Sequence, residues 1–288
     1  MRPNLTAFLF QDMQLALAAG AARTPEPPPD GIAWLRTWAL LCLVVALALY
    51  LACGYHAGFL RLNGWAAGAS PWIWHWLTAL GDERVPFALS LLFARRYPRV
   101  FWALVVAGLV GTAFTHLGKP IFDALRPPAV LDPGSFNLIG PRRMRNSFPS
   151  GHSATAGVFF AVLVCYVRST WARALLTLLA VLIGLSRVAV GVHWPVDVAT
   201  GLMGGVLAAW IGVRLAARVQ WGALGPAPHL TLVTLAVLMT ASLTFSDGGY
   251  DLASGLLRLL GKLGLGAAAS TYLVLPIGRW RRAPQAKP

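Results

Sequence analysis

The chain has 288 residues, of which 57% are hydrophobic and only 12% are charged. A soluble domain is about one quarter charged, so this composition excludes a soluble globular protein and predicts a polytopic membrane protein. The formal net charge is +14 at pH 7, but most arginines lie in short clusters between apolar runs. Such clusters are typical of membrane topology signals, so no nucleic-acid partner is expected.

The N-terminal segment, residues 1–36, predicts a short amphipathic helix and then a proline-rich linker around Pro25–Pro29. Gln11 and Asp12 interrupt its apolar run, so a cleaved signal peptide is not expected. The three cysteines all fall in apolar runs without metal-ligand spacing. They are interpreted as small buried hydrophobic side chains: Cys42, Cys53 and Cys165.

The rest of the chain predicts an all-α, polytopic transmembrane helical bundle. About 20 apolar residues cross a bilayer as a helix. A six-helix core is expected within residues 37–218, and residues 219–288 add a pair of C-terminal spans and a basic tail. Glycines four apart in the sixth span, Gly201 and Gly205, predict close helix packing. The spans are expected near 37–56, 80–95, 99–118, 152–168, 172–190, 195–214, 229–246 and 255–277.

Three polar stretches interrupt this apolar pattern, and the first is "KPIFDALRP", residues 119–127. Lys119 and Arg126 each suit a contact with a lipid headgroup. Considered with Arg187 they supply three positive charges against the nearly two negative charges of a phosphomonoester. Arginine can hold phosphate oxygens in a bidentate manner. Together these cations could hold a phosphoryl group without a metal ion.

The second stretch is "PSGH", residues 149–152, where the helix at 152–168 begins. The free N–H groups and the positive dipole end of a helix N-terminus favour an anion. Gly151 allows a close backbone approach, and Ser150 adds a hydroxyl. An ordinary serine N-cap explains Ser150 and Gly151 equally well. His152 favours a functional site, because an imidazole at a membrane edge needs a partner.

The third stretch is "SRVAVGVHWPVD", residues 186–197. Pro195 disfavours helix at the preceding residue, so His193 is expected in a break between two helices. Asp197, four residues on, can orient one imidazole nitrogen and leave the other free as a base or nucleophile. Arg187 suits either the phosphate or an ordinary place at a helix C-terminus near the interface.

Membrane topology follows from the positive-inside rule. With a cytoplasmic N-terminus, every basic cluster outside the polar stretches lies on one side, together with the C-terminus. Residues 118–151 and 191–194 then face the periplasm or exterior of a bacterial inner membrane. The clusters that lie inside are Arg95, Arg96 and Arg99; Arg168 and Arg173; Arg214 and Arg218; and Arg279, Arg281 and Arg282.

In this order and spacing the three motifs resemble the signature of the type 2 phosphatidic acid phosphatase family, whose site is shared with vanadium haloperoxidases and glucose-6-phosphatase. Residues 80–214 carry the resemblance. It implies that His193 attacks phosphorus to form a phosphohistidine, that Asp197 orients it, and that His152 protonates the leaving oxygen. It also implies five phosphate-binding residues and no cofactor or metal: Lys119, Arg126, Ser150, Gly151 and Arg187.

The expected function is therefore that of a metal-independent lipid phosphatase, whose substrate enters sideways from the leaflet. Candidate substrates are undecaprenyl diphosphate, phosphatidic acid, phosphatidylglycerophosphate and lipid A phosphates. Phosphotransfer to another acceptor would use the same phosphohistidine. A non-enzymatic scaffold or lipid carrier would not need the acid and nucleophile. The sequence leaves the oligomeric state open.

Other polar residues are interpreted as less informative. The basic run before "PSGH", Arg142, Arg143 and Arg145, either attracts anionic lipid in general or favours a substrate with a second phosphate. Asp82 and Glu83 suit a solvated helix N-terminus. The remaining histidines are interpreted as structural or interfacial: His56, His75, His116 and His229.

Overall fold

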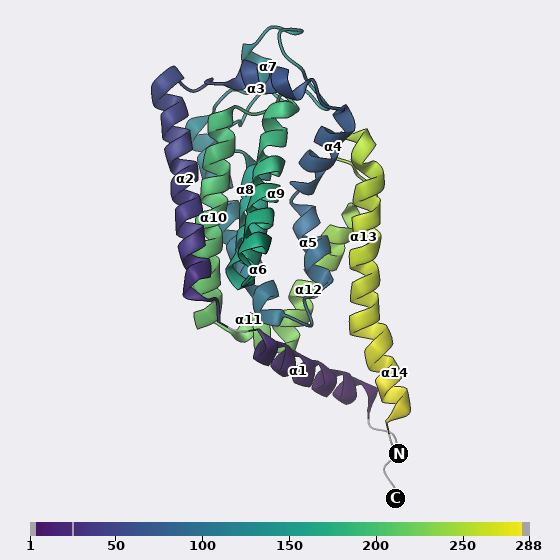
Figure 1. Cartoon of the computed structure of the whole chain (residues 1–288). Coiled ribbons are helices and arrows are strands. Elements are labelled where there is room, and N and C mark those ends of the chain that lie inside the picture. The colour runs from purple at the N-terminus through teal and green to yellow at the C-terminus, as the bar shows by residue number, and fades with distance from the viewer. Residues whose placement is uncertain (1–3, 25, 284–288) are drawn as a thin grey trace, which may run out of the picture.

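A computed structural model describes residues 4–24 and 26–283. Its described part is helical without strands, and long helices run side by side as a bundle (Figure 1). Six of its helical segments are long and apolar enough to cross a membrane. The prediction of an all-α polytopic bundle is confirmed. The helices of its central part are α2 (Pro29–Cys53), α6 (Pro98–Phe122), α8 (Gly151–Tyr166), α9 (Thr170–Ala189) and α10 (Pro195–Arg218).

Helix α10 lies at the centre of the bundle, where glycines let its backbone approach α8. A Cβ atom added at Gly201 would lie 2.5 Å from the carbonyl oxygen of Ser150, and one added at Gly205 would lie 2.3 Å from that of Ala154. These distances leave no room for a side chain. The predicted close packing is confirmed, and it holds the N-terminus of α8 beside the N-terminus of α10.

The second predicted span differs most from the expectation. This region holds two short helices, α4 (Pro71–Leu80) and α5 (Arg84–Leu91), in place of one continuous span over residues 80–95. Neither is among the six helical segments long and apolar enough to cross a membrane. Gly81 ends α4 where a Cβ atom would lie 3.0 Å from the Cβ of His152. Asp82 then accepts hydrogen bonds from the backbone N–H and the guanidinium of Arg84. Asp82 is therefore bound to its neighbour inside the bundle.

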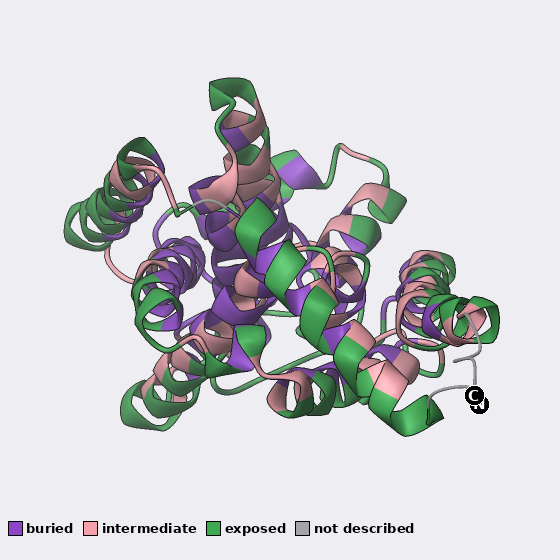
Figure 2. Cartoon of the chain, turned by 90° about the horizontal axis from the view of Figure 1, so that it is seen from below, coloured by how far each residue is buried: buried purple, intermediate pink, exposed green. Residues whose placement is uncertain are grey.

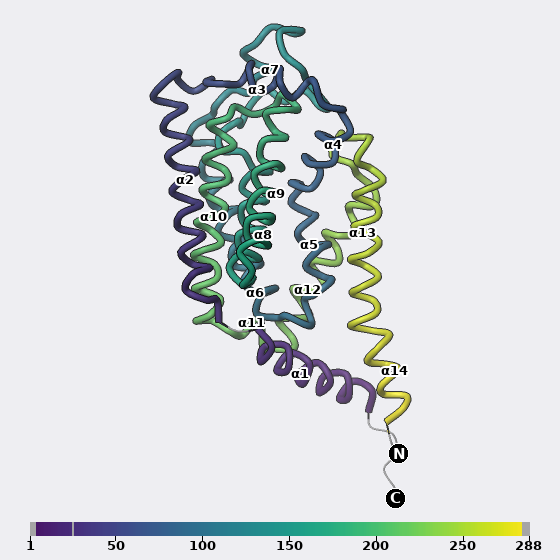
Figure 3. Tube along the Cα trace, in the orientation of Figure 1, coloured from purple at the N-terminus to yellow at the C-terminus, as the bar shows by residue number. Residues whose placement is uncertain are grey.

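Two short helices and their connections cover the end of the bundle at which α8 and α10 begin (Figure 3). These are α3 (Phe59–Ala66) and α7 (Pro127–Val130). Asn63 of α3 is buried, and its amide group donates to the carbonyl oxygens of Asn137, Val188 and Ala189. One asparagine thus fixes this covering layer to the end of α9.

The C-terminal part packs on the side of α4 and α5, away from α10 (Figure 1). This part has helices at the positions of the last two predicted spans, residues 229–246 and 255–277. Gly264 lies against α5, where an added Cβ atom would be 2.7 Å from the carbonyl oxygen of Ala88. The elements are α11 (Trp221–Leu224), α12 (Pro226–Ser242), a 3-10 turn (Asp251–Ala253), α13 (Ser254–Ala269), a π-helical turn (Ser270–Val274) and α14 (Leu275–Arg282).

Helix α1 (Leu5–Arg23) crosses the opposite end of the bundle, as the view from below shows (Figure 2). The predicted helix is present, but it is not amphipathic. Met13 and Leu17 are buried against the bundle, whereas Phe10 and Leu15 are apolar and exposed. Cys53 also differs from its prediction, because it is exposed, while Cys42 and Cys165 are buried.

Candidate active site

The three polar stretches meet at the end of the bundle covered by α3 and α7. His193 lies between α9 and α10 and is only 2% exposed. Its Nδ1 is 3.2 Å from Oδ2 of Asp197, and its Nε2 is 3.1 Å from Nη1 of Arg126. An arginine can only donate hydrogen bonds, so Nε2 must be the acceptor and Nδ1 must carry the proton. The unprotonated nitrogen of His193 therefore faces the arginine.

Asp197 is completely buried and is the centre of a network of donors. Besides His193, its carboxylate accepts hydrogen bonds from the Tyr55 hydroxyl, the Ser147 hydroxyl at 2.5 Å and the Trp194 backbone N–H at 2.9 Å. A carboxylate with four donors has a fixed orientation. The network therefore fixes the ring of His193 and its tautomer.

His193 is held in its neutral form. Burial lowers the pKa of His193 well below the usual range, and the positive charges of Arg126, Arg187 and Lys119 lower it further. Near pH 7 the imidazole is therefore uncharged, and Nε2 keeps its lone pair. A neutral imidazole oriented by a carboxylate is the form required of a nucleophile or general base.

Arg126 is held by the loop that follows α7. Its Nε donates to the carbonyl oxygen of Arg145 at 2.8 Å, and its Nη2 donates to that of Asn146 at 3.1 Å. Its Nη1 donates to the Val192 carbonyl oxygen at 3.2 Å. No carboxylate is among these partners, so the positive charge of Arg126 remains available to an anion.

Arg187, in the last turn of α9, is 2% exposed. Its Nη1 donates to the hydroxyl groups of Thr78 and Tyr250, the latter at 3.0 Å. Its Nε is buried without a hydrogen-bond partner within the described chain. A buried cation with an unpaired donor is costly, and an anionic ligand would satisfy it.

The "PSGH" stretch begins α8 beside these groups. Ser150 is the N-cap, since its Oγ accepts from the Ser153 N–H and hydroxyl, and its own N–H donates to the Asp197 carbonyl oxygen at 3.1 Å. Both interpretations of Ser150 therefore coexist, because its hydroxyl proton is still free to donate. A Cβ atom on Gly151 would lie 3.7 Å from Nζ of Lys119, so the ammonium group stands at this helix N-terminus.

His152 follows in the first turn of α8. The positive charges of Arg187, Arg143 and Arg126 act on it, so it lies in the same electrostatic environment as His193. Its ring makes no hydrogen bond within the part of the chain that the structure describes. All eight residues predicted for the site are thus brought together at one end of the bundle.

Four further polar residues of the site were not anticipated: Tyr55, Thr78, Ser147 and Tyr250. Ser147 directly precedes "FPSGH", and this position next to a motif is the one signal that points to it. The other three lie in apolar or glycine-rich surroundings outside the motifs, and nothing in their spacing points to the site.

The remaining predictions have mixed outcomes. Arg142 donates to the Pro128 carbonyl oxygen, and Arg145 forms an exposed ion pair with Asp123. Arg143 makes neither a hydrogen bond nor an ion pair with any described residue, and its charge acts on Lys119 and Arg126. His56 stacks on Trp194 at 3.9 Å between ring centroids, and His229 bonds Tyr272, as expected of structural histidines.

The donor set suits an anion rather than a metal ion. The positive charges of Lys119, Arg126 and Arg187 act on His193, and cations repel a metal ion. Within residues 4–24 and 26–283, no group of three or more His, Cys, Asp or Glu side chains is placed to hold a metal.

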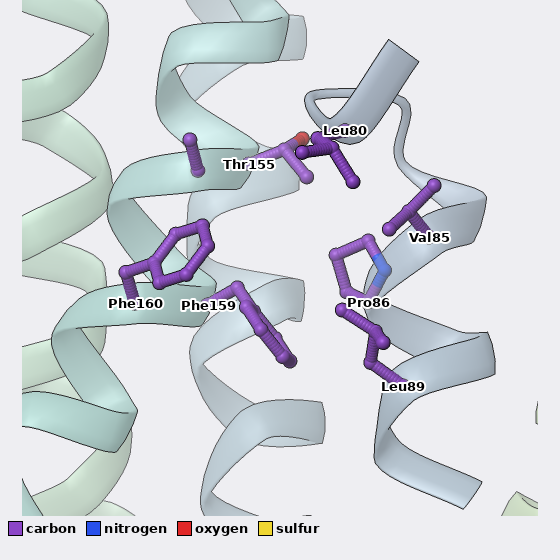
Figure 4. Close-up of a pocket in the computed structure, with 8 residues that line it drawn as sticks. Leu80, Val85, Pro86, Leu89, Thr155, Phe159 and Phe160 are labelled. Carbon is purple, nitrogen blue, oxygen red and sulfur yellow. The ribbon is translucent and has the colours of Figure 1, made fainter. Parts of the chain in front are cut away.

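A small apolar pocket lies beside the site, between α4–α5 and α8 (Figure 4). Thr155, which lies one helical turn after His152, is the lining residue of α8 nearest to His152 in the sequence. The side chains of α5 face the two phenylalanines of α8 across it. Its lining residues are Leu80, Val85, Pro86, Leu89, Thr155, Ala156, Phe159 and Phe160.

Fold and site together define a multi-pass, all-α membrane protein that buries an oriented, neutral histidine among arginines. Residues 99–221 match the family model described as the PAP2 superfamily. All three polar stretches lie inside the matched range.

Several known proteins are similar to this chain. The chain is 44% identical over 154 residues to the Escherichia coli protein YbjG, covering 54% of this chain and 64% of that protein. It is 28% identical over 188 residues to the undecaprenyl-diphosphatase of Sulfolobus acidocaldarius, covering 62% and 90%. The crystal structure of Aquifex aeolicus LpxE resembles it with a TM-score of 0.49 and 28% identity, covering 54% and 92%. The chain thus covers less than two thirds of YbjG.

Proposed function

We propose that this protein is a membrane lipid phosphatase that works through a phosphohistidine at His193 and needs no metal ion. The observation that carries the proposal is the buried, neutral His193, with its protonated nitrogen on Asp197 and its free nitrogen facing Arg126. A scaffold or lipid carrier would have no use for an oriented nucleophile.

In the proposed first step, Nε2 of His193 attacks phosphorus, and the bond from phosphorus to the leaving oxygen breaks. His152 gives a proton to that oxygen, and it must be protonated to do so, a form that the negative charge of the bound phosphate favours. Water then attacks the phosphohistidine, gives a proton to His152, and breaks the P–N bond. Inorganic phosphate leaves, and both histidines return to their starting state.

The proposed phosphate ligands are Lys119, Arg126, Arg187 and the N-terminus of α8 with Ser150 and Gly151. Their three positive charges offset the charge that develops on the equatorial oxygens. When phosphate binds, Nη1 of Arg126 would exchange His193 for a phosphate oxygen, which releases the lone pair for attack. The unpaired Nε of Arg187 would gain its missing partner.

The apolar lining of the pocket beside His152 favours a lipid substrate. A hydrocarbon chain packed against these lining residues would place the phosphate one helical turn away, at the start of α8. Undecaprenyl diphosphate, phosphatidic acid, phosphatidylglycerophosphate and lipid A phosphates are the candidates. The name of the Sulfolobus relative favours the first of these. Transfer of the phosphoryl group to another acceptor is the alternative.

The proposed setting is a bacterial inner membrane. Helices α1 and α14 lie at the end opposite the site (Figure 1). By the positive-inside rule that end, with both termini, would be cytoplasmic, and the site would face the periplasm or exterior. We further propose residues 37–218 as the phosphatase core and 219–288 as an addition to it.

The deciding experiment measures phosphate release by the purified protein in detergent, with EDTA, from each of the four lipids. We expect release from at least one lipid, at a rate that EDTA leaves unchanged. Loss of activity with EDTA that Mg²⁺ or Zn²⁺ restores would contradict the metal-independent mechanism. Failure to release phosphate from any lipid would reject hydrolysis and leave phosphotransfer to be tested with labelled donor.

A second prediction concerns Arg143, the one arginine of its run without a described partner. Replacing it with glutamine is expected to lower kcat/KM about tenfold for undecaprenyl diphosphate but little for phosphatidic acid, because only the diphosphate has a second phosphate to bind. Arg145→Gln removes an exposed ion pair and serves as the control. Equal losses on both substrates would indicate general attraction of anionic lipid.

A further inference from the structure

The C-terminal helix pair lies beyond the PAP2 match, which ends at residue 221, yet one segment of it reaches the site. This segment connects α12 to α13 and contains Tyr250, which is only 4% exposed. The Tyr250 hydroxyl is 3.0 Å from Nη1 of Arg187, and the guanidinium carbon of Arg187 lies 5.7 Å from the centre of the Tyr250 ring. The C-terminal part thus contacts a cation of the candidate phosphate site.

Tyr250 is itself held firmly. A Cβ atom added at Gly140 would lie 2.6 Å from its ring, and the ring of His75 meets it edge-on at 5.7 Å. The next two residues are tied to α4, since Asp251 is 3.5 Å from Nδ1 of His75 and the Leu252 carbonyl oxygen accepts from the Trp76 indole. The hydroxyl therefore has a defined position relative to α9.

The chemistry of the contact suits a cation that must bind an anion. A carboxylate partner would neutralise Arg187 and compete with phosphate for it. The hydroxyls of Thr78 and Tyr250 fix Nη1 without cancelling the charge. The buried Nε stays unpaired and available. Such support preorganises an arginine for ligand binding.

We propose that Tyr250 is a positioning residue that orients Arg187 for the phosphoryl group. The C-terminal helix pair therefore contributes a residue to the phosphate site. This inference rests on the proposed phosphatase function, because it assigns Arg187 to the phosphate.

The test replaces Tyr250 with phenylalanine, which keeps the ring and removes only the hydroxyl. We expect kcat/KM to fall about tenfold and orthovanadate to inhibit about tenfold less well, since one hydrogen bond to a charged group is lost. The matched control is Tyr272→Phe, which removes another tyrosine hydroxyl of the C-terminal helix pair. The Tyr272 hydroxyl lies away from the site, 2.8 Å from Nε2 of His229. This control should match the wild type in both measurements.

A double-mutant cycle separates positioning from general stability. In an Arg187→Lys background the Tyr250→Phe change should have almost no further effect, because the guanidinium it orients is gone. A similar tenfold loss in both backgrounds, or in Tyr272→Phe, would overturn the proposal. So would a folded Tyr250→Phe protein with wild-type kinetics and vanadate inhibition.

The failure of the phosphatase proposal would look different. In that case the wild type releases no phosphate, and orthovanadate binding is measured in place of kinetics. The measure of binding is the thermal stabilisation of the detergent-solubilised protein by orthovanadate. Tyr250→Phe should still reduce this stabilisation while Tyr272→Phe does not. Equal stabilisation of all three proteins would overturn the role of Tyr250 independently of catalysis.

Discussion

Replacing His193 with alanine is expected to lower kcat by about 10⁴-fold or more, the usual cost of removing a nucleophile. The reason is that Nε2 carries the lone pair that the site orients toward phosphate, since Nδ1 lies against Asp197. Among the described residues, no carboxylate forms a hydrogen bond with Arg126 or Arg187. The measurement is phosphate release from the preferred lipid, with substrate-derived label retained on the quenched protein. Label that is stable to alkali and lost in acid is expected in the wild type and not in the variant.

The matched control is His116→Ala. His116 is exposed on α6, with Nδ1 3.0 Å from the Thr112 carbonyl oxygen, and lies outside the proposed machinery. It should keep wild-type activity. Substantial turnover by His193→Ala would refute the phosphohistidine mechanism and point to direct attack by water at the same cations.

Replacing Asp197 with asparagine is expected to lower kcat/KM by about 10³- to 10⁴-fold. Three donors besides His193 converge on this carboxylate, from Tyr55, Ser147 and Trp194. An amide would turn a donor toward one of them or toward Nδ1 of His193, and so favour the wrong tautomer. His193 would then carry its proton on Nε2 and lose the lone pair needed for attack.

The same change should also destabilise the protein, by about 1–3 kcal/mol, because a buried network loses its acceptor. Thermal unfolding in detergent measures this separately from kinetics. Asp123→Asn is the control, since its ion pair with Arg145 is exposed and contributes at most about 1 kcal/mol. An Asp197→Asn protein with near wild-type kcat/KM would show that His193 needs no carboxylate to orient it.

The sequence alone determined the class of protein and most of the candidate site. Apolar runs of bilayer length predicted the helical bundle, because a membrane leaves the backbone few alternatives. The site residues, such as Lys119, Ser150 and His193, could be found because each lies in a motif of a few consecutive residues. A proline or glycine breaks the helix where a polar group is needed, so the break and the side chain occur together in the chain.

Tertiary structure alone decided what surrounds those motifs. Tyr55 bonds Asp197 across 142 residues, and Tyr250 bonds Arg187 across 63 residues. A lone tyrosine in an apolar chain is compatible with a membrane interface or a core, and only packing selects its partner. The need for glycine at position 81 has the same origin, because a Cβ atom there would lie 3.0 Å from the Cβ of His152 on another helix. Short-range chemistry can be read along the chain, whereas contacts between distant segments depend on how the helices pack.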